Sequence, residues 1–430
     1  MSKRRVVITG MGMITPLGHG VETVWQAMLA GKSGMSPTEL FDASTFPTKF
    51  SAQVKNFRLA DHLPNPQDHA RATRNTQWAL AAAQQAWDQA KLPMRGELDR
   101  TRIGIYLGSG EGSIDFDNFM ACLVESWANG KLDTVKWAKV AQGRMDLYRE
   151  LEQESNMVAC HLAGQFQVTG PVYNVLTACA ASTQALGEAT GQIRRGEVDV
   201  MISGGAHSMI HPFGVTGFNR LTALSTRNDS PETASRPFDR TRDGFVLGEG
   251  ASILILEELE FALRRGATIL AEVIGFGSSA DAYRITDQDP EGDGAASAMR
   301  AAMQDAGVGP GQIDYINAHG TGTAQNDSVE SRAMRAAFGQ YAKTVPVSSI
   351  KSMVGHLIAA AGATELITCV MAIRDGMVPP TTNYSVPDPD CDLDYVPNQP
   401  RKVDVTIAMS NSFGFGGQND SLIIQRFAGR

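Results

Sequence analysis

Ile105-Tyr-Leu-Gly-Ser-Gly110 and Tyr315-Ile-Asn-Ala-His-Gly320 are the two stretches that decide the fold of this chain. Each has the composition of a buried strand that ends in a glycine turn. They lie in different halves of the sequence, which indicates that one folding pattern occurs twice. Chance similarity between two α/β segments is the alternative interpretation.

Three further pairs of segments repeat in the same order. They are two strand-like pairs, Val198-Asp-Val-Met-Ile202 with Val403-Asp-Val-Thr-Ile407 and residues 6–10 with 272–275, and one pair of small-residue helices, 180–195 with 357–374. Val/Ile runs that alternate with helices predict an α/β fold whose strands are covered on both faces. We divide the chain into residues 1–257 and 258–430, two related halves of one compact unit.

Three segments do not follow the regular repeat. Residues 111–160 carry charged and aromatic side chains, which predicts helices that cap the core or meet a partner. Residues 379–400 are rich in proline and aspartate and predict an irregular surface excursion. A final pair of strands is expected at 403–409 and 421–427, around Ser410-Asn-Ser-Phe-Gly-Phe-Gly-Gly417.

Composition excludes several classes of protein. The 430 residues are 43% hydrophobic and 20% charged, as in an ordinary globular protein. A net charge of −8 argues against a nucleic-acid-binding protein. The N-terminus lacks the apolar stretch of a signal peptide, and no window approaches the length of a membrane span. We therefore expect a cytoplasmic protein.

Cys179 is the candidate nucleophile among five cysteines (122, 160, 179, 369 and 391). Their spacing fits neither a zinc site nor a disulfide framework, so we expect reduced thiols and no metal. Thr-Ala-Cys-Ala-Ala-Ser joins a strand-like run to a helical one. That position puts the sulfur at a helix N-terminus, which lowers the pKa of a thiol. A buried structural cysteine is the alternative, and it fits the other four.

Two histidines lie in glycine-rich turns far downstream. His319 belongs to Asn-Ala-His-Gly-Thr-Gly-Thr, and His356 ends Lys-Ser-Met-Val-Gly-His, which begins at Lys351. Each follows a presumed strand, which favours a catalytic role over that of an ordinary core or surface histidine. Glu330 and Glu365 are placed to orient the histidines and the lysine, although both also fit helical surface charges.

Together these motifs closely resemble the β-ketoacyl-acyl-carrier-protein synthases of the KAS I/II type, and KAS II in particular, within the thiolase superfamily. The resemblance covers nearly the whole chain. It extends to three further motifs: Ala223-Leu-Ser-Thr-Arg-Asn228, Ser235-Arg-Pro-Phe-Asp239 and Arg242-Asp-Gly-Phe-Val-Leu-Gly-Glu-Gly250. It implies a thiolase fold, with five α-β-α-β-α layers built from two related halves, and a homodimer.

The resemblance also implies a reaction, the decarboxylative Claisen condensation that elongates fatty acids. An acyl group would move from the phosphopantetheine arm of acyl carrier protein to Cys179, and malonyl-carrier protein would then lose CO2 and attack it. No bound cofactor is implied. His319 and His356 would stabilise the enolate, with Lys351 and Glu330 holding the histidines in place. The N–H groups of Cys179 and Phe413 would form the oxyanion hole.

The remaining candidate residues would contact the substrate or the carrier. Candidate substrate contacts are Phe415, Phe245, Glu111, Thr321 and Thr323, where Phe413 and Phe415 would also gate the second substrate. Candidate contacts with the acidic carrier are Arg71, Arg74, Arg220 and Arg227. Solvated surface arginines are the alternative.

Other functions remain open at this point. They are a specialised type II polyketide ketosynthase and a non-catalytic partner subunit of a heterodimer. The intact cysteine and histidines argue against the non-catalytic partner. A coenzyme A thiolase is disfavoured because the C-terminal glycine loop lacks that family's second cysteine.

Four residues depart from the usual KAS II pattern. Glu111 stands where an apolar residue commonly lines the far acyl pocket, and a buried carboxylate there would be costly. Arg284 replaces a common histidine and is a candidate to neutralise Glu111 or to meet a phosphate. Thr222 and Gln418 also differ from the pattern. We therefore expect a shorter, polar or unsaturated acyl substrate.

Overall fold

Strands β1 (Val6–Thr15) and β11 (Ala271–Ala280) lie side by side at the centre of the sheet on which the fold is built. The computed structural model describes residues 4–94, 98–112 and 114–429. The two strands run antiparallel, with Val6 opposite Val273, and they belong to different halves of the sequence. Their pairing joins the halves into one continuous sheet.

Outward from this central pair, both halves repeat one strand order. In the first half, β1 is followed by β10 (Gly250–Glu258), β9 (Val200–His207), β5 (Ile103–Ser109) and β8 (Val172–Val175). In the second, β11 is followed by β17 (Gln418–Gln425), β16 (Ile407–Gly414), β12 (Tyr315–Asn317) and β13 (Val347–Ser348). In each half the first two pairings are antiparallel and the last two parallel. The two stretches that predicted duplication therefore form the equivalent strands β5 and β12.

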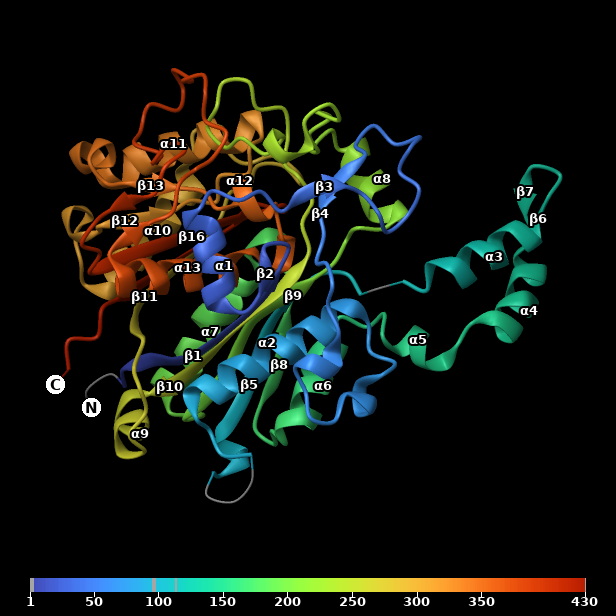
Figure 1. Cartoon of the computed structure of the whole chain (residues 1–430), viewed down its shortest axis with the longest axis horizontal. Helices are drawn as coiled ribbons and strands as arrows, with labels where there is room; N and C mark the ends of the chain where they lie inside the picture. The colour runs from blue at the N-terminus through green and yellow to red at the C-terminus, as the bar shows by residue number, and fades with distance from the viewer. Residues whose placement is uncertain (1–3, 95–97, 113, 430) are drawn as a thin grey trace.

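Helices complete the five layers that were expected (Figure 1). Two helices, α7 (Ala181–Arg195) and α13 (Ala361–Asp375), contact each other between the halves, and each follows a 3-10 turn, η4 (Ala178–Ala180) or η8 (Ile358–Ala360). The outer helices are α2 (Arg74–Ala90) and α6 (Met157–Phe166) on the first half and α10 (Asp293–Ala306) and α11 (Ala324–Phe338) on the second. A Cβ at Gly362 would lie 1.9 Å from Oγ1 of Thr183, so the small residues of both central helices permit their close approach.

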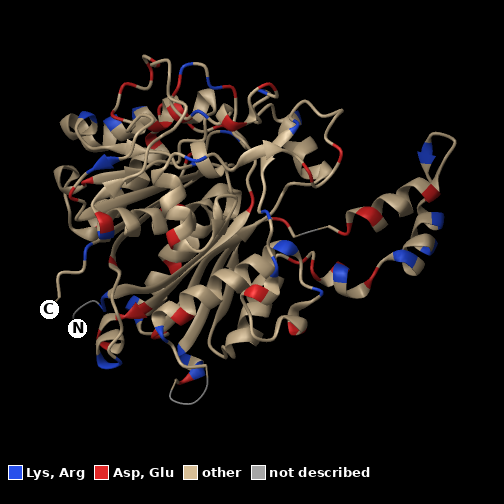
Figure 2. Ribbon diagram, viewed as in Figure 1, with Lys and Arg blue, Asp and Glu red and all other residues tan. Residues whose placement is uncertain are grey.

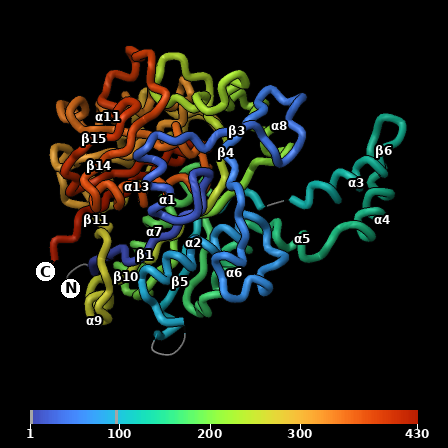
Figure 3. Tube along the Cα trace, in the orientation of Figure 1, coloured from blue at the N-terminus to red at the C-terminus, as the bar shows by residue number. Residues whose placement is uncertain are grey.

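Residues 114–152 form an arm, not a cap over the core. Helices α3 (Phe116–Ser126), α4 (Thr134–Arg144) and α5 (Leu147–Leu151), with the hairpin of β6 (Trp127–Ala128) and β7 (Lys131–Leu132), project from the body (Figures 1 and 3). Among the described residues from 111 to 166, those of α6 join the core cluster, and Phe116 and Phe119 of α3 pack edge-on against Phe213. Val124, Val135 and Leu147 are exposed on the arm.

The C-terminal region has the predicted elements, but one strand begins later than predicted. Residues 379–400 contain no helix and no named strand, as expected, and the final two strands do form an antiparallel pair. However, β16 begins at Ile407, four residues later than predicted. The Asp314 carboxylate accepts hydrogen bonds from the backbone N–H groups of Thr406 and Ile407 just before the ladder begins.

The remaining strands and α-helices are short. They are β2 (Gly18–His19), α1 (Val21–Leu29), β3 (Met35–Pro37), β4 (Phe50–Ala52), α8 (Pro212–Arg220), α9 (Leu259–Arg264), α12 (Lys351–Val354), β14 (Met377–Val378) and β15 (Arg401–Lys402). Charged residues gather on the outer helices, the loops and the arm (Figure 2). Within the described ranges, no helix combines the length and apolar character needed to cross a bilayer.

Candidate active site

Cys179 lies in η4, at the N-terminal end of α7. Its side chain is buried, with 5% of its surface exposed. Ala178, just before it, has a φ of +49°, and Ile358 has the same φ at the equivalent position of η8. A positive φ is unusual for alanine and a true outlier for a β-branched residue, so both turns are held under strain by their surroundings.

The thiol is not acidic in this environment. Burial raises the pKa of Cys179 to about 11, and the Lys351 charge and a hydrogen bond from the backbone N–H of Phe415 only partly offset it. The expectation that the helix N-terminus lowers this pKa below the usual value is therefore wrong. The buried sulfur holds its proton at rest and must lose it during the reaction.

His356 is the imidazole that contacts the thiol. Its Nε2 lies 3.1 Å from Sγ of Cys179, and its Nδ1 accepts a hydrogen bond of 3.2 Å from the backbone N–H of Ile358. Nδ1 therefore carries no proton, and the N–H of the ring is at Nε2. Burial and the Lys351 charge hold the pKa of His356 well below 6.5, so the ring is neutral.

His319 has the same tautomer for a different reason. Nζ of Lys351 lies 3.4 Å from Nδ1 of His319, and an ammonium group can only donate. The proton of the ring is therefore at Nε2. Burial and the same lysine charge hold the pKa of His319 well below 6.5. The rings of His319 and His356 are 5.4 Å apart, and both line one cavity.

A buried polar network supports this pair of rings. Nζ of Lys351 pairs with the Glu365 carboxylate and donates to the carbonyl oxygen of His319 at 2.5 Å. Glu330 accepts from the backbone N–H groups of His319 and Gly320, at 2.8 and 2.7 Å. Burial raises the pKa of Glu330 to about 7. Glu330 thus holds the backbone of the His319 turn, and Glu365 holds the lysine.

A cavity of about 430 Å³ brings most of the predicted residues together. Its walls include Cys179, His319, His356, Phe413, Phe415, Phe245, Thr321 and Thr323. The Phe245 ring packs edge-on against His356, with centroids 5.1 Å apart. The ring of Phe413 faces that of His319, with centroids 5.8 Å apart. The backbone N–H that donates to the sulfur of Cys179 belongs to Phe415.

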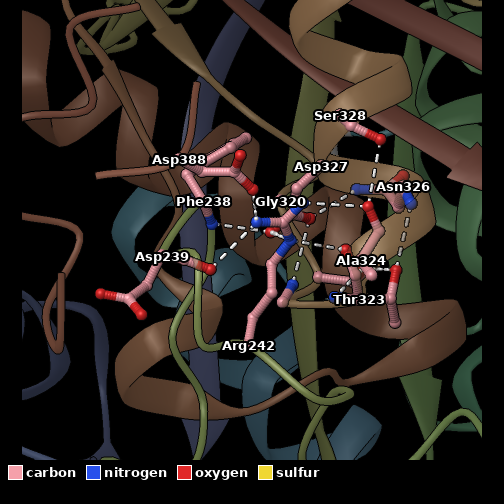
Figure 4. Close-up of polar contacts among 12 residues, drawn as sticks. Phe238, Asp239, Arg242, Gly320, Thr323, Ala324, Asn326, Asp327, Ser328 and Asp388 are labelled. Carbon is pink, nitrogen blue, oxygen red and sulfur yellow. Dashed lines mark hydrogen bonds and ion pairs between the residues drawn. The ribbon is translucent and has the colours of Figure 1, made fainter. Parts of the chain in front are cut away.

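Arg242 is a buried residue that the sequence analysis did not single out. It donates to the carbonyl oxygens of Thr323 and Ala324, at 3.0 Å each, and pairs with Asp327 and Asp388 (Figure 4). It therefore ties the turn that carries His319 to the irregular C-terminal excursion. The signal in the sequence is the place of Arg242 in the Arg-Asp-Gly motif, which also carries the family resemblance.

Two predicted residues lie outside the cavity. Glu111 faces His207, with Oε2 3.5 Å from Nε2, and Arg284 donates to Asp287 at 3.2 Å. Arg284 therefore does not neutralise Glu111 in this structure. Thr222 does line the cavity, as does Asp287.

The candidate docking arginines fall into two groups. Arg71 stacks on the ring of Tyr148, and Arg74 donates to the buried carboxylate of Glu249 at 2.7 Å. Arg220 is exposed at the end of α8, just before residues that line the cavity. Arg227 lies 3.4 Å from Asp243, which also lines it.

The five cysteines are all free, in agreement with the sequence analysis. Cys122, Cys369 and Cys391 are buried, but Cys160 is exposed, so the structural interpretation is wrong for that residue. Donor atoms of Cys179, His319 and His356 lie within 4.8 Å of one another. Both imidazoles point a protonated Nε2 at this space, so a metal ion would have to displace these protons.

Comparisons with known proteins agree with this geometry. The family model "Beta-ketoacyl synthase, N-terminal domain" matches residues 3–262, and "Beta-ketoacyl synthase, C-terminal domain" matches residues 270–385. The chain is 44% identical to the 3-oxoacyl-[acyl-carrier-protein] synthase 2 of Coxiella burnetii, over 99% of both chains. It is 43% identical to the Vibrio cholerae protein of the same name, over 99% of this chain and 100% of that one.

Solved structures show the same fold. A β-ketoacyl synthase from Burkholderia phymatum superposes with a TM-score of 0.88 at 34% identity, covering 99% of this chain and 100% of that one. The ishigamide ketosynthase/chain length factor gives a TM-score of 0.87 at 36% identity, with the same coverage. Motifs, strand order, cavity and relatives agree, and the chain belongs to the β-ketoacyl synthase family.

Proposed function

We propose that the chain catalyses a decarboxylative Claisen condensation that elongates fatty acids. It joins an acyl group carried on Cys179 to a malonyl group carried by acyl carrier protein, and it yields β-ketoacyl-carrier protein and CO2. The observation that carries this proposal is a thiol beside two neutral imidazoles whose Nε2–H groups enter one cavity. A thioester enolate needs hydrogen-bond donors at its oxygen, and these groups are preorganised to supply them.

The first half-reaction loads Cys179. Sγ attacks the acyl thioester on the phosphopantetheine arm, the carbon–sulfur bond to the arm breaks, and the thiol proton passes to the departing pantetheine sulfur. The backbone N–H groups of Cys179 and Phe415 stabilise the oxyanion. Phe415 replaces Phe413 in this role because its N–H already donates to the sulfur.

The second half-reaction forms the carbon–carbon bond. Malonyl thioester loses CO2, and the electron pair of the broken bond forms an enolate whose oxygen accepts from Nε2–H of His319 and His356. The enolate carbon attacks the acyl carbonyl on Cys179, the carbon–sulfur bond breaks, and the released thiolate takes up a proton. No bound cofactor takes part in either step.

The proposal is tested by supplying acyl-carrier protein and labelled malonyl-carrier protein to the purified chain. We expect an acyl adduct on Cys179, release of labelled CO2 and a β-ketoacyl product. The Cys179→Ala variant is the control and should form no adduct. Absence of the product with the unmodified chain, across short and long acyl groups, would refute the proposal.

The carrier is proposed to dock beside the mouth of the cavity, at Arg220 and Arg227. Their closeness to cavity residues supports this position. Charge reversal in Arg220→Glu should raise KM for the carrier without changing kcat. Arg71 and Arg74 remain candidates. However, Arg71 stacks on Tyr148 of the arm and Arg74 pairs with Glu249, so reversing either charge perturbs packing as well.

We also propose that the active form is a cytoplasmic homodimer of two-half subunits, with residues 1–257 and 258–430 as the halves. Support for a second copy comes from β8, which lies at one end of the sheet beside exposed apolar side chains at Val172, Tyr173 and Leu176. The exposed apolar side chains of the arm also support contact with a second copy. A monomer by light scattering at micromolar concentration would contradict this assembly.

A polyketide ketosynthase is the second candidate. Its support is the likeness to the ishigamide ketosynthase/chain length factor and to a ketosynthase solved with a type II polyketide acyl-carrier protein and a hexaketide, the latter with a TM-score of 0.86 at 34% identity. Full activity of the purified chain with no added partner subunit would favour the homodimeric elongating enzyme.

A further inference from the structure

His207 is a buried imidazole whose position the proposed reaction does not explain. Its side chain is 1% exposed, and within the described part of the chain Nδ1 has no hydrogen-bond partner, whereas Nε2 faces the Glu111 carboxylate. The nearest charged atom is Oε2 of Glu111, 3.5 Å from Nε2, a distance typical of an ion pair. An unpaired polar group in the interior is destabilising, so this ring calls for a partner that binds during the reaction.

The ring is directed toward the active-site layer. Alternate residues of a strand share a face, so His207 and Gly205 of β9 point the same way. A Cβ at Gly205 would lie 2.6 Å from the carbonyl oxygen of Ala359 and 2.9 Å from Cβ of Ser182. These two residues belong to the turns and helices that carry Cys179 and follow His356. His207 therefore faces the layer that holds Cys179 and His356.

Gly110, just after strand β5, leaves space for the imidazole ring of His207. A Cβ at Gly110 would lie 2.1 Å from Nε2 of His207, so only glycine fits against the imidazole. Glu111 follows immediately, and His207 is the main cause that lowers the pKa of its carboxyl to about 2. The carboxylate is therefore ionised on the Nε2 side of the ring. Nδ1 is left free.

The residues that follow His207 in the chain belong to the apolar cluster around the sulfur. Cys179 clusters with apolar side chains that include Ile210, Phe245 and Ile358, and Met209 packs against the same cluster. Met209 and Ile210 follow His207 directly in the chain. The apolar cluster around the sulfur therefore begins two residues after the buried His207.

We propose that His207, backed by Glu111, is a hydrogen-bonding subsite for the acyl group on Cys179, and that the chain prefers acyl groups bearing a hydroxyl or carbonyl oxygen. This inference rests on the proposed condensation and names its substrate class. An oxygen on the acyl chain satisfies the free nitrogen, whereas an unsubstituted alkyl chain leaves it unpaired. Sites that hydrogen-bond a substrate group discriminate strongly against analogues that lack it, and we expect at least about a tenfold preference here.

Competition between small thioesters tests the subsite. The unmodified chain is incubated with decanoyl-pantetheine and a series of decanoyl-pantetheines with one hydroxyl at successive carbons, and intact mass reports which acyl group reaches Cys179. One position in the series should be loaded at least about tenfold faster than the unsubstituted chain. A parallel oxo series separates an accepting from a donating substrate oxygen.

Variants assign the preference to the imidazole. In His207→Leu the preference should disappear, and in His207→Gln, which keeps a hydrogen-bonding group, part of it should remain. His62→Leu is the matched control, since His62 stacks on Phe57 outside this cluster and its loss should leave the ratio unchanged. The ratio is measured within each protein, so a lower folded fraction does not alter it.

The outcomes separate this inference from the reaction on which it rests. Equal loading of plain and oxygenated chains, or a preference that survives in His207→Leu, would overturn the subsite. If no thioester acylates Cys179 in the unmodified chain, the proposed function fails instead.

Discussion

Removing Lys351 should separate what this residue does for stability from what it does for catalysis. Its ammonium group and the Glu365 carboxylate are 2% and 1% exposed, so the two form a directly contacting ion pair in a buried site. Lys351→Met leaves Glu365 buried without a cation, which costs about 3–5 kcal/mol of unfolding free energy. Lys351→Met combined with Glu365→Leu removes both charges and should recover most of that loss, because a buried pair contributes little relative to apolar side chains.

The catalytic effect should persist in both variants. Without Lys351, Nδ1 of His319 can carry the ring proton, and the lone pair at Nε2 then faces the enolate oxygen. Loss of one such donor lowers kcat by about 10²–10³-fold. Transfer of an acyl group to Cys179 does not use the Nε2–H of His319, and the tautomer of the neighbouring His356 is held by Ile358, so this step should change only a few-fold.

Chemical denaturation measures the first effect, and malonyl decarboxylation against acyl loading by mass spectrometry measures the second. The reasoning is refuted if the double variant is as unstable as the single one. It is equally refuted if the double variant regains both stability and condensation, because the lysine would then act only through folding.

Three further predictions follow from the geometry. Alkylation of Cys179 by iodoacetamide should speed up with pH through pH 9 and level off only near the pKa of about 11, because burial keeps the thiol protonated; a plateau below pH 9 would contradict this. Gly362→Ala should lower the thermal midpoint, since the added methyl meets Thr183 and overpacking costs about 1–3 kcal/mol; an unchanged midpoint would show that the central helices can separate. Arg242→Met should cost about 3–5 kcal/mol by leaving Asp327 unpaired, and urea unfolding of this variant at wild-type concentrations would count against the ion pair.

Local composition was enough to predict the repeated α/β pattern and to single out Cys179, His319 and His356, which the fold brings to one cavity. The strand-to-glycine stretches identified β5 and β12, and the small-residue runs identified α7 and α13, because buried strands and closely packed helices constrain residue type at each position. The arm was not predicted as an arm. Whether an amphipathic helix caps its own core or extends away is decided by tertiary contacts that sequence periodicity does not contain.

Electrostatics and long-range pairing were the weaker part of the prediction. A helix N-terminus predicted an acidic thiol at Cys179, but the size of the opposing desolvation depends on how completely distant segments enclose the sulfur. The pairing of Arg284 was open for a similar reason, since its neighbour Asp287 and the distant Glu111 are equally good partners by charge alone. Phe413 lies in β16 opposite Asn419, whereas Phe415 lies in the turn between β16 and β17, where its amide reaches the sulfur.

Duplication explains why the chemistry lies where it does. The two halves bring η4 and η8 into contact, so that the N-terminal ends of α7 and α13 meet at Cys179 and His356. Both ends present backbone N–H groups and the positive end of a helix dipole to the same space. A negative charge that appears there, on sulfur or on an enolate oxygen, is stabilised from two sides although the resting thiol is not ionised. The site is therefore organised for charge that develops during the reaction and not for a charge that is present at rest, which is what differential stabilisation of a transition state requires.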